Sequence, residues 1–321
     1  MSEPLFVKRA SGAPVSVTLG AMNFGKRTPE AEALRIVDRA HERGVRIIDT
    51  ANVYENGASE RIVARALAAR PGAFRVATKV GLARSGRRAE GLAPAVVKRA
   101  FDESRGRLGV DVIDLYYLHA PDHEVPIEDT LDAVLELVQS GKLRAFGVSN
   151  YASWQILEIV QRCTALSAPG PVVAQQMYNL LVRQLDVEYF RFARKYALPT
   201  TTYNALAGGL LARPLAFDAV PKGSRFDENA MYRRRYWSRA FFEAVERYRA
   251  MAEERGRSLA SLSYGFLAAR PDVDSVLVGP ATCEHLDVAL DGLAQPLDDA
   301  TMRAIDDVAR DLAGTDATYA R

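Results

Sequence analysis

The sequence predicts an α/β fold, a (β/α)8 TIM barrel that forms a single domain over residues 1–321. Short apolar runs alternate with longer amphipathic segments along the whole chain, as strands alternate with helices in such a fold. The runs are nearly continuously apolar, which is typical of parallel strands buried on both faces. A chain of 321 residues, 48% of them hydrophobic, can fill the core of a barrel. The predicted strands span residues 15–22, 45–51, 74–80, 111–119, 143–150, 172–179, 198–206 and 273–279.

The segments on either side of the first strand have clear local signals. Residues 5–17 are expected to form a short N-terminal hairpin that turns at Ser11-Gly12. Residues 28–44 have the apolar spacing of an amphipathic helix, with Thr28 as the predicted N-cap and Gly44 as the stop. Similar helical patterns separate the later strands.

A long loop is predicted after the seventh strand, from Gly208 to about Arg239. It has seven basic residues between Arg213 and Arg239 against three acidic ones. Loops of this length inside a compact domain are usually lids or binding loops, although charged loop residues are often only solvated.

The composition argues against several classes of protein. The 42 basic and 40 acidic residues give a net charge of +2, so no nucleic-acid partner is expected. No apolar run approaches the length of a membrane span, and the first residues lack a signal peptide. The cysteines, Cys163 and Cys283, have no metal-binding or redox spacing. A reduced, cytoplasmic protein is the simplest interpretation.

Polar groups stand at the ends of three consecutive predicted strands. Asp49 ends the second strand, Lys79 the third and His119 the fourth, and Tyr54 follows the second strand in its loop. Taken singly, Lys79 could be a solvated rim lysine and His119 an ordinary core histidine. Because active sites of such barrels lie at the carboxyl ends of the strands, the four side chains together predict a catalytic group.

These four residue types suit the reduction of a carbonyl group. A tyrosine has a pKa of about 10, and the nearby cation of Lys79 is expected to lower it by about 1–3. Asp49 would supply the counter-charge that a buried lysine needs. Tyr54 could then donate a proton to the carbonyl oxygen while His119 offers it a hydrogen bond and hydride arrives at the carbon.

Hydride transfer requires a nicotinamide cofactor, and the chain has no G-x-G-x-x-G motif for a Rossmann site. The cofactor is therefore expected to lie across the mouth of the barrel. A Ser-Asn pair at a strand end can equally be a helix cap. Candidate contacts are Ser149 and Asn150 for a carboxamide, Gln175, Tyr203 as a stacking ring, and Gly208 and Gly209 beside a pyrophosphate.

At this point the sequence resembles the aldo-keto reductase superfamily over nearly the whole chain. The resemblance rests on "IIDTANVY", "TKVG", "DLYYLH", "GVSN" and "YNALAGGLL". It is closest to the aflatoxin-aldehyde and succinic-semialdehyde reductases, in "LGAMNFGKR", "QQMYNLLVRQ", "SRFDENAMYRRRYW" and a terminal arginine. It implies NADPH-dependent reduction of aldehydes, with ketones and dicarbonyls as further candidates, by a tetrad of Asp49, Tyr54, Lys79 and His119.

The resemblance also implies a set of cofactor-binding positions. Many relatives have a basic residue where this chain has Ala281 or His285, and an Asn that commonly helps to hold adenine is Ala289 here. Thr282, His285 and Arg225 remain as partners for a 2′-phosphate, and NADPH is expected to be preferred to NADH. The full set is Met22, Asp49, Ser149, Asn150, Gln175, Tyr203, Asn204, Leu206, Gly208, Gly279, Pro280, Ala281, Thr282 and His285.

For the substrate, the resemblance implies arginines that bind an acidic group near the carbonyl. They correspond to Arg235 and to the C-terminal Arg321, with Tyr54 and His119 at the carbonyl itself. The expected partner is thus a small carbonyl compound, and family analogy adds a homodimer.

Two alternatives remain. The first is a metal-dependent barrel hydrolase that uses His119, Asp122 and His123 of "HAPDH", but the chain has only four histidines and too few stand at strand ends. The second is a nicotinamide-binding regulatory subunit with little turnover, similar to the β subunits of potassium channels. It would keep the tetrad and act through a partner surface.

Overall fold

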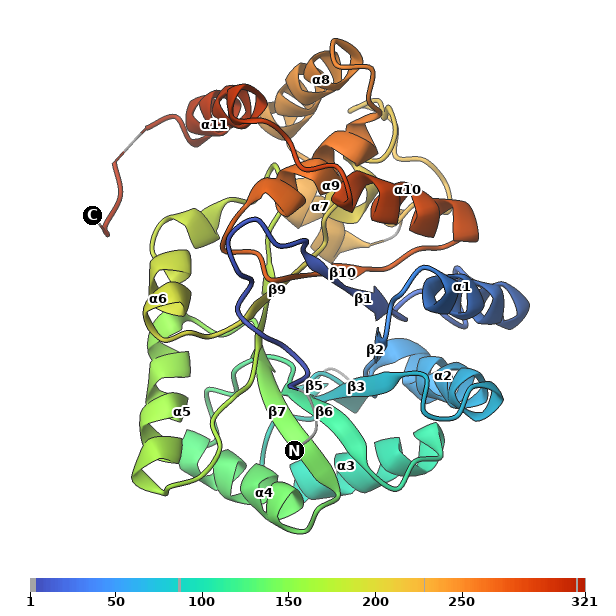
Figure 1. Ribbon diagram of the computed structural model, residues 1–321, viewed down its shortest axis with the longest axis vertical. Coiled ribbons are helices and arrows are strands. Elements are labelled where there is room, and N and C mark those ends of the chain that lie inside the picture. The colour runs from blue at the N-terminus through green and yellow to red at the C-terminus, as the bar shows by residue number, and fades with distance from the viewer. Residues whose placement is uncertain (1–3, 86–87, 228, 316, 321) are drawn as a thin grey trace.

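The protein is a closed barrel of eight parallel strands surrounded by helices, as the computed structural model shows (Figure 1). The structure describes residues 4–85, 88–227, 229–315 and 317–320. The barrel prediction is confirmed, and each predicted run contains one strand. Around the barrel these are β1 (Ser16–Gly20), β2 (Ile47–Asp49), β3 (Arg75–Val80), β6 (Ile113–Leu118), β7 (Leu143–Ser149), β8 (Ala174–Met177), β9 (Thr200–Tyr203) and β10 (Ser275–Val278), with β10 paired to β1.

Most helices bury one apolar side against the outside of the barrel, whereas α8 packs against α9 and α11. In α1 the buried residues are Ala33, Ile36, Val37 and Ala40, which recur at helical spacing. The helices are α1 (Glu30–Glu42), α2 (Ala58–Ala69), α3 (Pro94–Leu108), α4 (Ile127–Gln139), α5 (Ser153–Ala165), α6 (Tyr189–Lys195), α7 (Ala230–Tyr236), α8 (Arg239–Glu253), α9 (Leu259–Ala269), α10 (Cys283–Leu293) and α11 (Asp299–Ala313). Short 3-10 turns are η1 (Tyr54–Gly57), η2 (Gln184–Asp186) and η3 (Ala207–Gly209), and β4 (Arg84–Ser85) pairs with β5 (Arg88–Ala89).

The predicted N-terminal hairpin is wrong. The chain does turn at Ser11-Gly12, but no paired strands precede β1 in the described residues. The reason is that this segment bonds to the barrel instead of to itself. Asp274 accepts hydrogen bonds from Lys8 Nζ at 2.9 Å and from the Arg9 N–H at 2.6 Å. Phe6 packs with Ala77, Leu115, Tyr117 and Val173, and so closes the amino end of the barrel.

Thr28 is not the N-cap of α1. The helix begins at Glu30 after Pro29, without a side-chain cap. The Thr28 hydroxyl is buried and donates to the Ala281 carbonyl at 3.2 Å. The hydroxyl that was expected to cap the helix therefore bonds to a residue distant in sequence. Gly44 does follow the end of α1, with a left-handed φ of 86°.

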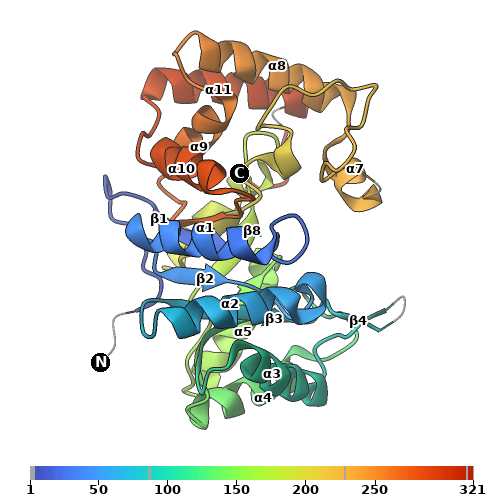
Figure 2. The same cartoon turned by 90° about the vertical axis from the view of Figure 1, so that its right-hand side faces the viewer.

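The long connection after β9 is present, and part of it is ordered into η3 and α7. Its aromatic side chains pack together: the rings of Phe226 and Trp237 lie 4.8 Å apart, and Phe226 also meets Tyr232 edge-on. Figure 2 shows α7 and β4 projecting on the same side of the barrel, opposite the N-terminal segment. Within the described ranges, none of the helices combines the length and apolar character needed to span a membrane.

Candidate active site

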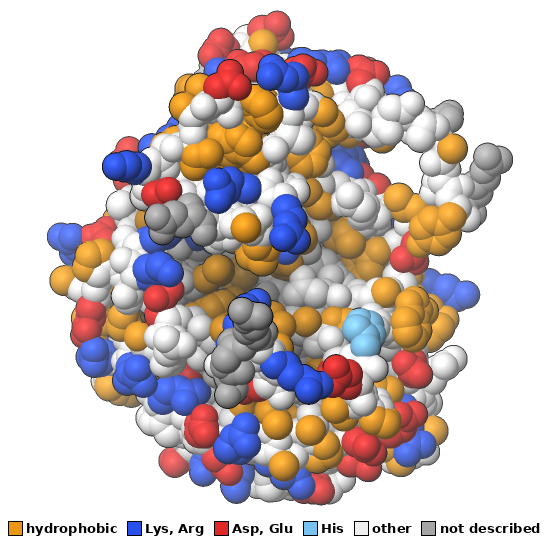
Figure 3. All heavy atoms as spheres, turned by 180° about the vertical axis from the view of Figure 1, so that it is seen from behind, with side chains coloured by type: hydrophobic (Ala, Val, Ile, Leu, Met, Phe, Trp, Pro, Cys, Tyr) orange, Lys and Arg blue, Asp and Glu red, His pale blue; other side chains and the backbone are white. Residues whose placement is uncertain are grey.

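The carboxyl ends of the strands open on one face of the molecule. Seen from this side, the surface is hollowed at its centre, with basic side chains on the rim (Figure 3). The residues predicted to be catalytic lie inside this mouth.

Lys79 contacts two of the other three predicted catalytic residues. Its ammonium is fully buried and forms an ion pair with Asp49. It also donates to the Thr50 carbonyl at 2.8 Å and to the Tyr54 hydroxyl at 3.4 Å. Because β2 and β3 are neighbouring parallel strands, their ends place Asp49 and Lys79 side by side. Burial lowers the pKa of Lys79, and the Asp49 carboxylate opposes this by stabilising the cation.

His119 lies beside Tyr54, one residue beyond the end of β6. The two rings meet edge-on with their centroids 5.9 Å apart. The Nδ1 atom of His119 is buried and has no hydrogen-bond partner among the described residues. Burial, and then the charge of Lys79, hold the pKa of His119 well below its usual value. The imidazole is therefore neutral and has one N–H to donate.

The predicted direction of the Tyr54 pKa shift is wrong. Its pKa lies well above the ordinary value, first because of burial and then because of the Asp49 carboxylate. The Lys79 cation does not lower it as predicted, since its charge is already paired with Asp49. The phenol consequently holds its proton at neutral pH, as a proton donor must before it reacts.

The loop that carries Tyr54 has an unusual backbone. Glu55, Asn56 and Gly57 all have left-handed φ values, of 46°, 51° and 80°. Gly57 is packed closely: a Cβ at this position would lie 2.7 Å from Cδ of Arg107. A side chain at position 57 would therefore be strained and would require Arg107 to move, so Arg107 packs tightly against this loop.

Arg107 is itself held by a buried carboxylate that the sequence analysis missed. Glu60 is completely buried in α2 and accepts from Arg107 Nε at 2.5 Å and from the Thr78 hydroxyl at 2.6 Å. The negative charge of Glu60 also favours the charged form of Lys79. A signal was available, because Glu60 stands three residues before Val63 on the buried face of α2.

The predicted cofactor residues on β7, β8 and β9 form one network. The Asn150 amide donates to the His119 carbonyl at 2.8 Å and accepts from the Tyr203 hydroxyl at 2.5 Å. It also donates to the buried Ser149 hydroxyl at 3.0 Å. Gln175 donates to Asp49 at 3.0 Å, so it contacts the tetrad directly.

Four residues of the segment after β9 have left-handed φ values: Asn204, Ala207, Gly208 and Gly209. Asn204, with a φ of 66°, donates to the Tyr236 hydroxyl at 2.8 Å and accepts from the Gly208 N–H at 3.2 Å. A Cβ on Gly208 would meet the Tyr232 ring at 2.8 Å, whereas Gly209 faces open space. The Leu206 carbonyl accepts from the Gly209 N–H at 2.8 Å. Gly208 is thus needed for packing, and Gly209 offers the room predicted beside a pyrophosphate.

The turn from β10 to α10 is held by the first loop. Asn23 donates to the carbonyls of Gly279 and Pro280, at 3.0 and 3.3 Å. Thr282 caps α10 by accepting from the His285 N–H at 3.2 Å, and the His285 side chain is exposed. The start of α10 already has an anion, because the Cys283 N–H donates to the Glu32 carboxylate at 3.1 Å.

Three arginines, Arg27, Arg225 and Arg235, lie around Tyr232. Arg225 donates to Asn23 at 2.5 Å and to the Tyr232 hydroxyl at 3.0 Å, and it contacts the half-exposed Met22. The guanidinium carbon of Arg235 lies over the Tyr232 ring, 5.8 Å from its centroid.

Arg27, which the sequence analysis missed, has a pKa lowered by burial and then by the charge of Arg225. Its only signal was its place in the "MNFGKR" loop. No ion pair involves Arg27, Arg225 or Arg235 in the part of the chain that the structure describes. Arg321 lies outside the described residues.

The "HAPDH" motif is divided between two places. His119 faces Tyr54, whereas Asp122 and His123 line a separate pocket between α4 and α5. Among the described residues, no group of three or more His, Cys, Asp or Glu could hold a metal ion.

The residues at the mouth fit a nicotinamide. Nδ1 of His119 has no hydrogen-bond partner in the described part of the chain, and the partly exposed Tyr203 ring offers a flat surface. The Asn150 amide bonds to Tyr203 and to the His119 carbonyl, and the Gln175 amide bonds to Asp49.

Residues 16–310 match the Aldo/keto reductase family. The chain belongs to this family. It is 32% identical to the mouse protein "Aflatoxin B1 aldehyde reductase member 2" over 324 residues, which cover 95% of this chain and 88% of the relative. The human protein of the same name is 33% identical over 316 residues, with 94% and 88% covered.

A solved structure of another family member has the same architecture. The glycerol dehydrogenase of Gluconobacter oxydans superposes with a TM-score of 0.79 at 27% identity and covers 98% of both chains. The resemblance found in the sequence is therefore confirmed, and this aldo/keto reductase is an oxidoreductase that acts on carbonyl groups.

Proposed function

We propose that the protein reduces aldehydes to alcohols with NADPH, and that Tyr54 is the proton donor. The observation that carries the proposal is the buried Lys79 ammonium, which bonds to Asp49 and contacts the Tyr54 hydroxyl beside a neutral His119. A phenol, a cation and a hydrogen-bond donor at one point can protonate a carbonyl oxygen.

Each of the four residues has a distinct role in the proposed reaction. A bound reduced nicotinamide would supply hydride to the carbonyl carbon. Tyr54 gives its proton to the carbonyl oxygen, and Lys79 donates to the phenolate oxygen as it forms. Asp49 keeps Lys79 charged, and the His119 N–H donates to the same carbonyl oxygen. Ser149, Asn150, Gln175 and Tyr203 would hold the nicotinamide, the segment from Asn204 to Gly209 the pyrophosphate, and the turn from Gly279 to His285 the adenosine phosphate.

A regulatory role is the second candidate, because the chain also resembles potassium-channel subunits. It is 31% identical over 280 residues to an Arabidopsis thaliana protein named "Probable voltage-gated potassium channel subunit beta", with 84% of each chain covered. A panel of aldehydes and ketones with NADPH or NADH, followed by nicotinamide absorbance, separates the two. Sustained turnover over many cycles supports the reductase, and a single turnover without a steady rate supports the regulatory subunit.

The rim arginines support an acidic substrate. Arg235 has no ion-pair partner among the described residues, and a guanidinium binds a carboxylate through two parallel hydrogen bonds. A charge-assisted hydrogen bond contributes roughly 1.5–3 kcal/mol, so Arg235→Ala should lower kcat/KM for succinic semialdehyde about 10–150-fold, mainly through KM.

A neutral aldehyde such as nitrobenzaldehyde should be much less affected, and Arg234→Ala, on the exposed side of α7, is the matched control. Equal losses on both aldehydes would mean that Arg235 supports the loop rather than the substrate.

Glu32 bears on the choice of cofactor. Its carboxylate occupies the Cys283 N–H at the start of α10, where Thr282 and His285 are proposed to meet a 2′-phosphate. We expect NADPH to bind more tightly than NADH, and Glu32→Gln to raise that preference roughly two- to fivefold by removing a like charge. Fluorescence titration of both cofactors measures this, with Glu30→Gln on the same helix as control. An unchanged ratio would show that the 2′-phosphate is bound elsewhere.

A further inference from the structure

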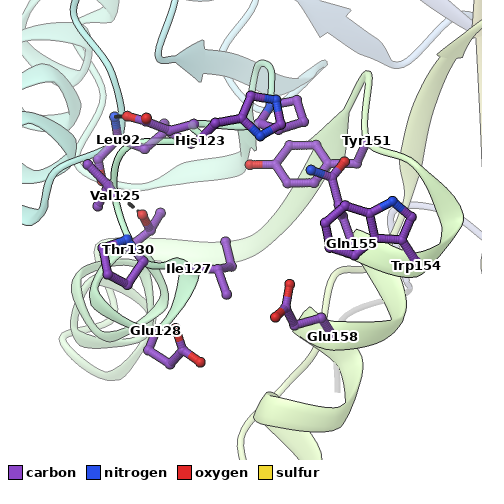
Figure 4. Close-up of a pocket in the computed structure, with 13 residues that line it drawn as sticks. Leu92, His123, Val125, Ile127, Glu128, Thr130, Tyr151, Trp154, Gln155 and Glu158 are labelled. Atoms are coloured by element: carbon purple, nitrogen blue, oxygen red, sulfur yellow. Dashed lines mark hydrogen bonds between the residues drawn. The ribbon is translucent and has the colours of Figure 1, made fainter.

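A second pocket lies on the carboxyl-end side of the barrel, apart from the tetrad. It has a volume of about 260 Å³ and is formed by the loop after β6, the start of α4 and the start of α5 (Figure 4). Its lining includes three carboxylates and two aromatic rings together with His123, Thr130 and Gln155, and neither lysine nor arginine is among the residues that form it. Neither the proposed reaction nor the cofactor positions use this pocket.

Tyr151 gives the pocket an unsatisfied polar group. The side chain is only 4% exposed, and its hydroxyl has no hydrogen-bond partner among the described residues. Figure 4 shows this hydroxyl pointing into the pocket, toward the side of His123 and Ile127. Burial, and then the charge of Asp122, raise the pKa of Tyr151, so the hydroxyl stays neutral. A buried hydroxyl without a partner is unfavourable, which makes it a place where a bound group would gain a hydrogen bond.

Two carboxylates lie at the outer side of the pocket. Glu128 comes from α4 and Glu158 from α5, and neither forms an ion pair within the described ranges. The third acid, Asp122, is already used, because its oxygens accept from the N–H groups of Leu92 and Glu124 at 2.8 and 2.9 Å. The free negative charge is therefore that of Glu128 and Glu158.

Trp154 adds an aromatic surface on the α5 side of the pocket, from the same helix as Glu158. It is 65% exposed, which is high for the largest apolar side chain, and it lies next to Gln155 on the wall opposite Val125 (Figure 4). An aromatic ring next to negative charge attracts a cation through both the ring and the carboxylates.

We propose that this pocket binds a small organic cation, a protonated primary alkylamine. The ammonium group would donate hydrogen bonds to Glu158 and Glu128 and lie against the Trp154 ring. The alkyl chain would contact Val125 and Ile127. The Tyr151 oxygen is covered by its neighbours, so the pocket side chains would have to move slightly as the amine binds before this oxygen could accept the third ammonium hydrogen.

The test is a titration of the full-length protein with n-butylammonium chloride at pH 7, followed by saturation-transfer NMR and calorimetry. n-Butanol, which has the same chain without the charge, is the ligand control. We expect saturable binding of butylammonium and markedly weaker binding of butanol. Glu158→Gln and Trp154→Leu should each lower the affinity for butylammonium roughly two- to fivefold.

Two further variants make the test specific. Tyr151→Phe keeps the ring and should lower the affinity for butylammonium. The affinity for tetramethylammonium, which has no N–H, should not change. Glu243→Gln removes an exposed carboxylate from α8, at the other end of the molecule in Figure 1, and should have no effect. Thermal unfolding and nitrobenzaldehyde turnover of each variant report whether the fold is intact.

Three outcomes would overturn the proposal. Equal binding of butylammonium and butanol would show that charge is not recognised. Unchanged affinity in the folded Glu158 and Trp154 variants would place the amine elsewhere. Binding of N-acetyl-lysine methylamide without binding of the free amine would make the occupant a lysine of a partner protein instead of a small molecule.

Discussion

Replacing Tyr54 with phenylalanine is expected to lower kcat for aldehyde reduction by about 10²–10⁴-fold. The variant keeps the ring that meets His119 edge-on and loses only the hydroxyl that contacts Lys79. The lower kcat would therefore come from loss of the proton donor alone, and the affinity for the cofactor should change little. Steady-state kinetics and a fluorescence titration of NADPH measure the two quantities separately. Turnover near the parent rate would exclude Tyr54 as the donor.

The raised pKa of Tyr54 gives this prediction a pH dependence. Reduction needs the protonated phenol, and a group whose pKa is raised keeps its proton to higher pH. The rate attributable to this acid should hence be constant through neutral pH and fall only in the alkaline range. A profile in which activity falls through neutral pH would point to another proton donor.

Replacing Arg107 with methionine is expected to have the largest effect on stability. It leaves the fully buried Glu60 carboxylate with the Thr78 hydroxyl as its remaining side-chain partner. Breaking a buried ion pair typically costs about 3–5 kcal/mol, and the partial exposure of Arg107 favours the lower end, about 3 kcal/mol. Denaturant unfolding measures the change in the free energy of unfolding.

The support that Arg107 gives to the left-handed loop after Tyr54 predicts a second effect. In Arg107→Met, kcat should fall in the protein that remains folded, because the phenol is less well placed. The double variant Glu60→Gln/Arg107→Met removes the unpaired charge and should recover much of the lost stability, though not the packing against Gly57. If the double variant is no more stable than the single one, the ion pair is not the source of the effect.

The sequence was sufficient to predict the strands and the convergence of the tetrad, because both follow from local patterns. Continuous apolar runs mark buried parallel strands, and polar residues at their ends must meet at one mouth. The effect of burial on a pKa could not be predicted from such local patterns. The shift expected for Tyr54 had the wrong direction because desolvation outweighs a cation that is already paired.

Contacts between segments distant in sequence were also beyond local patterns. Glu60 and Arg107 are 47 residues apart, and Glu32 reaches Cys283 across 251 residues. Thr28 has the chemistry of an N-cap, but its hydroxyl bonds to Ala281 across the barrel seam. In each case a tertiary partner decides the role of a residue whose local signal was ordinary or misleading.

The seam where β1 meets β10 has a consequence for biosynthesis. Asp274 binds Lys8 and Arg9, its carbonyl accepts from Ser16, and its carboxylate accepts from the Thr200 N–H at 2.7 Å. During synthesis, the segment from Lys8 to β1 therefore cannot form these contacts until β10, the last strand of the barrel, has left the ribosome. Until then β1 and β9 each have an unpaired edge, which is the surface through which incomplete sheets aggregate. Protection of these two edges, rather than the speed of helix formation, should govern how much of the newly made protein reaches the closed barrel.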